Sequence, residues 1–357
     1  MADATDTALV SSTNHYLDTE RTPPTCWKCS GTGSLPTKPA SPRDPSEPAQ
    51  RKQCPVCKGF KHIAAQPRVS SKPAVRPFKK PPPVGPPACF ALTDPEVAPG
   101  PGEFLSSLCG SWGIYQIVDG HRYTTDDVCT AMVAYRHLAR LHAPHPPTVE
   151  KHLDIGTGLS SVLLMTAHRF HTTLKQSVGV EAQTIHVRLA QRSIALNGLA
   201  ATASIRHGDL RDLARGDPGG LIPEGAVFDL VTGTPPYFPA AEGALPTVAG
   251  RGQCAFELRG GCEVYFDAAA RFMAPGPRSR FVVCQTSREI RRMERAAKAS
   301  GLRIMERWDV YGREGKAGPL FCVFCAARPD PDEAVGQGYD VRTLFVLLVE
   351  SGRPLPE

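Results

Sequence analysis

Residues 149–160 read VEKHLDIGTGLS, and this stretch decides the fold of the chain. The pattern predicts a strand that ends at Asp154, a tight turn that contains Gly156 and Gly158, and a helix over residues 162–169. Glycine lets the backbone approach a ligand closely, and the amino terminus of the following helix offers unpaired N–H groups. A strand, a glycine-rich turn and a helix in this order predict the first unit of a ligand-binding parallel sheet.

The units that follow repeat the alternation of strand and helix, which favours an α/β fold with a parallel sheet. The next expected strand ends at Glu181, whose carboxylate can bind both hydroxyls of a ribose. The third unit places Asp209 where it can accept a hydrogen bond from an adenine amine. The fourth strand runs into residues 233–238, GTPPYF, a loop at the carboxyl edge of the sheet, where ligands bind in such folds.

Further elements are expected on both sides of these units. Residues 113–125 predict a β-hairpin that turns at Asp119 and Gly120, and a helix follows as far as about His142. Apolar segments towards the carboxyl end predict the remaining strands of the sheet. A basic helix over residues 288–300 is either a solvated face or a second contact with nucleic acid.

Two groupings have residue types that bind metals, yet their surroundings favour other interpretations. His137, His142 and His145 lie at the end of a helix and in a proline-rich loop, so we interpret them as solvated. Cys322 and Cys325 are spaced as a C-x2-C pair, but they lie in an apolar strand with no second pair nearby. We therefore expect both thiols in the core.

Proline marks how the 357 residues divide into domains. Of the 35 prolines, 17 fall within residues 36–102, which excludes a continuous helix or a central strand there. We expect a disordered tail over residues 1–20, a zinc-binding module with a basic arm over 21–65, a proline-rich linker over 66–103 and an α/β domain over 104–357.

The positive charge of the chain is concentrated in its amino-terminal part. The formal net charge is +6, while residues 21–80 hold 13 basic and 2 acidic residues, a net of +11. Such an arm favours a polyanion, because binding releases the counterions of the polyanion. The sequence has no apolar run that suits a membrane span and no signal or transit peptide, so we expect a cytoplasmic or nuclear protein without a membrane partner. It makes no prediction of the oligomeric state.

Four cysteines near the amino terminus have the spacing of a structural zinc site. Cys26 and Cys29 form one C-x2-C pair, and Cys54 and Cys57 form the second. Two such pairs complete a closed tetrahedral site, and cysteines without a secretory signal favour reduced thiols or metal ligands. The two halves, CWKCSGTG and CPVCKGFK, resemble the repeated units of DnaJ-type zinc fingers. We expect zinc to supply the folding free energy of this module, on the order of 10–16 kcal/mol.

Four motifs in the carboxyl-terminal part resemble those of a known family. In chain order they are Asp-x-Gly-x-Gly at 154–158, Val-Glu at 180–181, Gly-Asp at 208–209 and x-Pro-Pro-Tyr at 234–237. Their order and spacing resemble class I S-adenosylmethionine-dependent methyltransferases that methylate amines, and most of all the tRNA adenine exocyclic-amine methyltransferases. Residues 121–131 are similar to the segment that precedes the first motif in that family. The resemblance covers roughly residues 112–345.

The resemblance implies a Rossmann-like methyltransferase fold of seven strands, with S-adenosyl-L-methionine as the cofactor. It implies that Asp154, Gly156 and Gly158 line the methionine end of the cofactor. Glu181 would hold the ribose and Asp209 the adenine. RNA is the partner that this family and the basic arm imply together.

The resemblance also implies what the loop at residues 234–237 does. An aromatic amine is a poor nucleophile because its lone pair is delocalised into the ring. In the family an Asn or Asp side chain and the first proline carbonyl accept the two amine hydrogens, which aims the lone pair at the methyl group. Pro235 and Pro236 match here, and Tyr237 would stack on the flipped base. Thr234 departs from the pattern, and losing one hydrogen bond would cost ~1–3 kcal/mol.

Three functions are compatible with these patterns. The leading hypothesis is an RNA methyltransferase that acts on an adenine exocyclic amine in tRNA or rRNA. A methyltransferase of a protein glutamine amide is the first alternative, because the same loop serves a planar amide. The second alternative is a catalytically impaired nucleic-acid-binding protein that keeps the cofactor fold, which Thr234 suggests.

Overall fold

The computed structural model describes residues 34–36, 51–53, 85–86, 97–239, 254–312, 317–329 and 338–345. Contacts between residues divide the chain into one unit of residues 16–81 and another of residues 1–15 and 82–357. In the smaller unit, β1 (Ser34–Pro36) pairs with β2 (Arg51–Gln53) in antiparallel fashion. The predicted tail and the four cysteines predicted as zinc ligands lie outside the described residues: Cys26, Cys29, Cys54 and Cys57.

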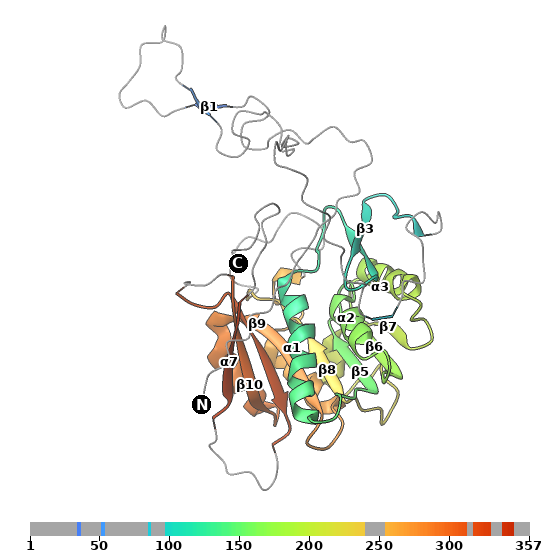
Figure 1. The fold of residues 1–357 in the computed structure, drawn as a ribbon, viewed down its shortest axis with the longest axis vertical. Helices are drawn as coiled ribbons and strands as arrows, with labels where there is room; N and C mark the ends of the chain where they lie inside the picture. Colours follow the sequence, from blue (N-terminus) through green and yellow to red (C-terminus); the bar gives the residue numbers. More distant parts are fainter. Residues whose placement is uncertain are drawn as a thin grey trace, which may run out of the picture. The chain divides into compact units, whose positions relative to one another are not determined.

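An eight-stranded sheet forms the centre of the larger unit in the described part of the chain (Figure 1). Its strands are β5 (Lys151–Ile155), β6 (Gln176–Glu181), β7 (Ala203–His207), β8 (Leu230–Gly233), β9 (Arg280–Thr286), β10 (Arg303–Tyr311), β11 (Phe321–Ala327) and β12 (Asp340–Phe345). They lie in the order β12-β10-β11-β9-β8-β5-β6-β7, and only β11 runs antiparallel to its neighbours. The predicted Rossmann-like α/β fold is confirmed, with β12 as an eighth strand beyond the seven expected.

The strand order reverses at the centre of the sheet, between β5 and β8. From β5 the chain proceeds outward through β6 and β7, then returns to β8 on the other side of β5 and continues to β9. In a parallel sheet such a reversal leaves a crevice beyond the carboxyl ends of the two strands, where ligands bind. Residues 156–158 follow β5 and residues 234–238 follow β8, so both predicted loops start at this crevice.

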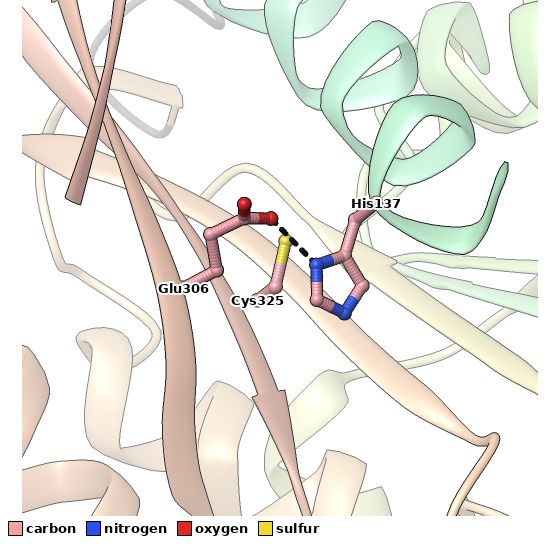
Figure 2. Close-up of side chains that lie close together, drawn as sticks. All are labelled: His137, Glu306 and Cys325. Atoms are coloured by element: carbon pink, nitrogen blue, oxygen red, sulfur yellow. Dashed lines mark hydrogen bonds and ion pairs between the residues drawn. The ribbon is translucent and has the colours of Figure 1, made fainter. Parts of the chain in front are cut away.

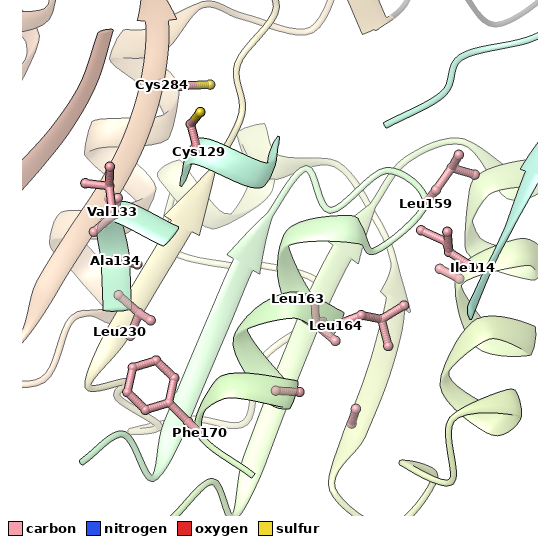
Figure 3. Packing of buried hydrophobic residues seen from close by; sticks show 14 of the residues in the cluster. Ile114, Cys129, Val133, Ala134, Leu159, Leu163, Leu164, Phe170, Leu230 and Cys284 are labelled. Atoms are coloured by element: carbon pink, nitrogen blue, oxygen red, sulfur yellow. The ribbon is translucent and has the colours of Figure 1, made fainter. Parts of the chain in front are cut away.

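Helices cover both faces of the sheet (Figure 1). They are α1 (Thr125–His142), α2 (Ser161–Arg169), α3 (Thr184–Leu196), α4 (Leu210–Ala214), α6 (Cys262–Phe272) and α7 (Ile290–Ala299). The first three share one apolar cluster with the sheet, part of which Figure 3 shows, and the last three share another. Successive residues of β9 alternate between them, Val282 in the first and Val283 in the second, as a two-sided strand requires. None of the helices in the described ranges is long and apolar enough to cross a membrane.

The β-hairpin predicted over residues 113–125 is wrong. β4 (Gly113–Ile117) pairs instead with β3 (Glu103–Ser107), which precedes it in the chain. Asn197 at the end of α3 accepts a hydrogen bond from the N–H of Gly113 at 3.1 Å and donates to its carbonyl at 2.8 Å. A contact between residues 84 positions apart helps to hold this strand, and a local turn pattern does not reveal it.

The carboxyl end of the predicted linker is held by the larger unit. The hydroxyl of Tyr115 donates to the carbonyl of Val97 at 2.7 Å. Glu103 forms ion pairs with Arg188 and Arg192 of α3, the first at 2.7 Å. These contacts attach the segment before β4 to the helix that follows β6.

Candidate active site at the carboxyl edge of the sheet

The glycine-rich turn after β5 has a backbone conformation that requires glycine. Gly156 (φ 65°) and Gly158 (φ 55°) both lie in the left-handed region, which glycine adopts at little cost. A Cβ atom on Gly156 would lie 2.4 Å from the hydroxyl oxygen of Tyr265, whereas one on Gly158 would meet no atom within 4 Å. The turn therefore packs closely against α6 at Gly156 and faces open space at Gly158.

Asp154, near the end of β5, holds this turn by accepting a hydrogen bond from Thr157. Its buried carboxylate accepts hydrogen bonds from the hydroxyls of Thr157 and Thr232, both at 2.6 Å, and burial raises its pKa to about 6. Because Thr232 donates to Asp154, its oxygen accepts from Nε2 of His152 at 2.8 Å, and Nδ1 of His152 accepts from Ser177 at 2.9 Å. Burial lowers the pKa of His152 to about 3, so the ring is neutral. Sequence reasoning missed this series of hydrogen bonds because the residues that form it come from three different strands.

Glu181 ends β6 and joins that strand to the glycine-rich turn. Its carboxylate accepts hydrogen bonds from the N–H groups of Gly158 at 3.0 Å and Gln183 at 2.7 Å. Burial alone would raise the pKa of Glu181, but the neighbouring His186, 3.7 Å away, and the hydrogen bonds from these two N–H groups outweigh burial and lower it. The carboxylate is therefore ionised at neutral pH.

The loop over residues 234–238 is held on two sides. Nε2 of Gln285, near the end of β9, donates to the carbonyl of Pro236 at 3.2 Å. The backbone of Phe238 exchanges hydrogen bonds with residues 255–257 at 3.0 and 2.8 Å. The loop therefore has a defined position between β9 and the segment before α6.

The two aromatic side chains of this loop differ in exposure. The hydroxyl of Tyr237 donates to Sγ of Cys284 at 3.5 Å, and burial raises the pKa of Tyr237 well above its ordinary value. Phe238 is 49% exposed, and its ring lies 5.6 Å from that of Phe256. Sequence reasoning assigned stacking mainly to Tyr237, but the larger exposed aromatic face is that of Phe238.

One cleft at the carboxyl edge of the sheet brings most of the predicted site together. Gly156, Gly158, Glu181 and residues 234–238 all line it. Asp154 and Asp209 are not among its lining residues. Sequence reasoning noted the segment over residues 121–131 but gave it no role in the site. This segment lines the cleft with residues just before α1 and in its first turn: His121, Tyr123, Thr124, Asp126 and Asp127.

The start of α1 places two carboxyl groups in this cleft. Asp127 accepts a hydrogen bond from the N–H of Thr124 at 2.7 Å, and the hydroxyl of Thr124 bonds to Asp126. Burial and then the charge of Asp126 raise the pKa of Asp127 to about 8, so Asp127 is mostly protonated at neutral pH. Asp126 is half-buried and contributes to the raised pKa of Tyr237, so it lies beside the loop.

Asp209 caps α4, and its carboxylate forms ion pairs with two arginines. Its carboxylate accepts hydrogen bonds from the N–H of Arg211 at 3.0 Å and from the guanidinium groups of Arg211 and Arg259 at 2.7 and 2.9 Å. Burial opposes ionisation, but these hydrogen bonds outweigh it and lower the pKa of Asp209 to about 2. An adenine amine would have to compete with both arginines for this carboxylate.

Outside the cleft, His137, Glu306 and Cys325 lie close together, as Figure 2 shows. Arg280 donates to Nε2 of His137 at 2.9 Å, so the ring proton is on Nδ1, which donates to Glu306 at 2.6 Å. Glu306 also accepts from Arg140 at 2.7 Å, and burial raises the pKa of the Cys325 thiol well above its ordinary value. Both ring nitrogens of His137 and the carboxylate of Glu306 already have partners, and the Cys325 thiol stays protonated, so the cluster connects α1 to β10 instead of binding a metal ion.

The three histidines predicted as solvated have different environments. His145 is exposed, but His142 is buried and His137 is largely buried. The prediction is wrong for these two because the carboxyl-terminal half of α1 lies against the sheet. Cys322 and Cys325 are both fully buried in β11, which confirms their assignment to the core.

Comparison with known proteins shows similarity of fold to solved structures. No protein-family model matches the chain, and no curated protein matches it. One similar structure is described as a predicted O-methyltransferase, protein Atu636, from Agrobacterium tumefaciens, with 17% identity over 56% of this chain and 80% of that chain and a TM-score of 0.37. The ribosomal protein L11 methylase from Lactobacillus delbrueckii subsp. bulgaricus has 14% identity over 58% and 81%, and a TM-score of 0.37. TrmN from Thermus thermophilus has 17% identity over 55% and 48%, and a TM-score of 0.34.

Proposed function

We propose that this protein is an S-adenosyl-L-methionine-dependent methyltransferase that methylates an exocyclic amine of adenine in RNA. The observation that carries the proposal is the meeting of three parts in one cleft: the glycine-rich turn, the Glu181 carboxylate and the loop over residues 234–238. A glycine-rich turn lets the backbone approach the methionine end of the cofactor closely. An acidic residue at a strand end suits the hydroxyls of its ribose. The third part has the motif that, in the family the sequence resembles, receives a planar amine.

The residues of the cleft fit this cofactor. The ionised Glu181 carboxylate suits two ribose hydroxyls, and the open space at Gly158 suits close approach of the methionine end. Asp154 would act indirectly, by holding the turn. Asp209 would hold the adenine by exchanging a hydrogen bond from Arg211 or Arg259 for one from the adenine amine, next to Gly208, which lines the cleft. When bound, the cofactor supplies an electrophilic methyl group.

The loop would orient the target amine towards that methyl group. The hydroxyl of Thr234 would accept one amine hydrogen and the carbonyl of Pro235 the other, while Phe238 offers an aromatic face to the base. The nitrogen forms the new N–C bond as the S–C bond breaks, the bonding electrons stay on sulfur, and the nitrogen then loses one proton. We assign Asp126 as the acceptor of this proton, because its carboxyl group lines the same cleft beside the loop.

We further propose that the amino-terminal part assists by binding RNA. Cys26, Cys29, Cys54 and Cys57 would hold one structural zinc ion, with the basic arm around them over residues 21–65. The support for this step is the paired cysteine spacing and the +11 net charge of residues 21–80.

Transfer of labelled methyl from S-adenosyl-L-methionine to total RNA, with and without nuclease and followed by nucleoside analysis, tests the proposal. We expect nuclease-sensitive label in adenosine methylated on its exocyclic amine. Label that survives nuclease and remains in protein would favour the glutamine amide instead. Measurable cofactor binding without any transfer would favour a nucleic-acid-binding protein whose activity is impaired at Thr234.

A further inference from the structure

The helix α7 has a buried side and a strongly basic side. Its buried side consists of apolar residues that belong to the second cluster under the sheet: Met293, Ala296 and Ala297. On the opposite side, α7 and the preceding turn η2 (Ser287–Glu289) carry four exposed cations: Arg288, Arg291, Arg295 and Lys298. Spacings of three and four residues place these cations along one side of the helix, which we call the basic face.

The charge of the basic face is not neutralised by the described residues. None of its four cations has an ion-pair partner in the described ranges. The adjacent Arg292, in contrast, binds Glu257 at 2.8 Å and Glu263 at 2.6 Å. Glu294 bonds instead to the hydroxyl of Tyr339 at 2.5 Å. Glu289, next to Arg288, lies 3.9 Å from Arg292. The four cations of the basic face outnumber the two carboxylates of the same segment, Glu289 and Glu294, so the face keeps a positive potential.

The basic face starts at the edge of the candidate active site. β9 ends at Thr286, and Gln285 bonds to Pro236 in the loop, so Arg288 follows only three residues after a contact with that loop. Arg292 connects α7 to Glu257, in the segment that contributes further residues to the cleft. The face extends from there along α7, and its last three cations span about 10 Å at 1.5 Å per residue.

We propose that the basic face binds the phosphate backbone of the RNA whose target base enters the cleft. This inference rests on the proposed function and adds a contact surface within the larger unit, separate from the amino-terminal arm. A row of arginines and lysines suits a chain of phosphates, which gives affinity and position without reading sequence. A protein partner is less well matched, because none of the exposed large apolar residues lies on η2 or α7.

Neutralising two central cations tests the proposal in the full chain. The variant Arg291→Gln/Arg295→Gln is compared with the wild type by fluorescence anisotropy, with a labelled single-stranded polyadenylate as the probe, over a range of salt concentrations. Each lost phosphate contact flattens the slope of log affinity against log salt by ~0.7 for a single strand, so we expect a decrease of ~1.4. Cofactor binding by calorimetry should be unchanged, because these side chains do not line the cleft.

A matched control comes from the opposite edge of the sheet. Lys151 and Arg278 are exposed near the amino ends of β5 and β9, so Lys151→Gln/Arg278→Gln removes the same charge away from the cleft. We expect this control to keep the wild-type slope. If the first variant does not fold, Arg288→Gln/Lys298→Gln carries the test with the same expected decrease.

Several results would overturn the inference without deciding the proposed function. These are equal slopes for the variant, the control and the wild type, or no binding of the probe by the wild type. Competition by polyglutamate as strong as that of RNA would also overturn it, in favour of an acidic protein. Loss of slope in a protein that transfers no methyl to RNA would instead support the basic face and contradict the proposed activity.

Discussion

In the proposed reaction, the hydroxyl of Thr234 is the acceptor for one amine hydrogen. A hydroxyl also carries a proton, which needs an acceptor of its own elsewhere. The side chain of Thr is also shorter than that of Asn or Asp, so its oxygen lies closer to the backbone. Gln285 fixes Pro236, and residues 255–257 fix Phe238, so the loop has little freedom to bring the shorter side chain closer. The rate of methyl transfer should therefore depend strongly on this single side chain.

We expect Thr234→Asn to raise kcat, because an amide oxygen accepts a hydrogen bond without a competing proton of its own. One improved hydrogen bond at ~1 kcal/mol corresponds to roughly a fivefold increase. The measurement is kcat with RNA as the acceptor, together with the cofactor Kd, which should not change. Thr234→Val keeps the shape and removes the acceptor, so its kcat should fall. Equal kcat in the Asn and Val variants would mean that this side chain does not contact the amine.

Asp127 makes the stability of the protein depend on pH. Its pKa is about 8 in the folded protein and 3.8 ordinarily, so between these values the folded state binds a proton that the unfolded state has lost. The contribution of Asp127 to the free energy of unfolding therefore falls as the pH rises from about 4 to about 8. Asp126 and Asp154 add to this shift through their charges.

Asp127→Asn should make the melting temperature less sensitive to pH. The amide keeps an oxygen for the N–H of Thr124 but does not titrate. Between about pH 5 and about pH 8 we expect the wild type to lose more thermal stability than the variant. Differential scanning calorimetry at matched ionic strength measures both, and parallel pH profiles would contradict the assigned shift.

At the scale of elements, Glu181 joins the end of β6 to the turn between β5 and α2. Because Gly158 and Gln183 both donate to its carboxylate, that group is oriented before any ligand binds. Glu181→Gln removes the charge at nearly constant shape. Hydrogen bonds to charged groups contribute ~1.5–3 kcal/mol, so we expect the Kd for S-adenosyl-L-methionine to rise by roughly 10–150-fold. Calorimetry tests this, with the exposed Glu150→Gln as a control that should bind as the wild type does.

The contact between β9 and the loop over residues 234–238 should affect catalysis more than cofactor binding. Gln285 is fully buried and donates to Pro236, so Gln285→Met leaves that carbonyl without this donor. We expect kcat to fall by roughly tenfold, since ~1–3 kcal/mol of loop positioning is lost, while the cofactor Kd stays within about twofold. Gln176→Met at the start of β6 is the matched control. A changed Kd with unchanged kcat would show that Gln285 supports the cofactor rather than the loop.

At the scale of the whole molecule, the chain combines two parts of different charge. Residues 104–357 hold 28 basic and 26 acidic residues, whereas residues 21–80 have a net charge of +11. The four uncompensated cations of the basic face therefore matter within a nearly neutral α/β domain. Long-range attraction to RNA would come mainly from the amino-terminal part, and the basic face would guide the bound strand to the cleft.

Metal analysis of the full-length protein should find about one zinc ion per chain, because one tetrahedral site uses four thiolates. Cys26→Ser/Cys54→Ser removes one ligand from each pair and should abolish the bound zinc. The calorimetric Kd for the cofactor should be unchanged, since the cleft belongs to the larger unit. Cys322→Ser is the control that should retain zinc, because that thiol is buried in β11. A zinc-free wild-type protein would contradict the predicted site.

The parts of the site that the sequence predicted are those specified by local pattern. A strand followed by Gly156 and Gly158, an acidic residue at a strand end and a Pro-Pro-Tyr loop are each encoded within a few neighbouring residues. Parallel strands then bring their carboxyl ends to one edge, so Glu181 and the loop could be placed together before the structure was known. The same reasoning predicted the α/β fold.

Tertiary structure alone decided which side chains complete and support that edge. Asp126 reaches the cleft because α1 packs across the sheet, and Gln285 reaches Pro236 because β9 lies beside β8. The series of hydrogen bonds from Ser177 through His152 to Asp154 likewise requires three strands in register. Such contacts join residues tens of positions apart and depend on packing, which no local spacing encodes. The sequence therefore determined the fold and the motifs of the site, and the packing of the sheet determined their partners.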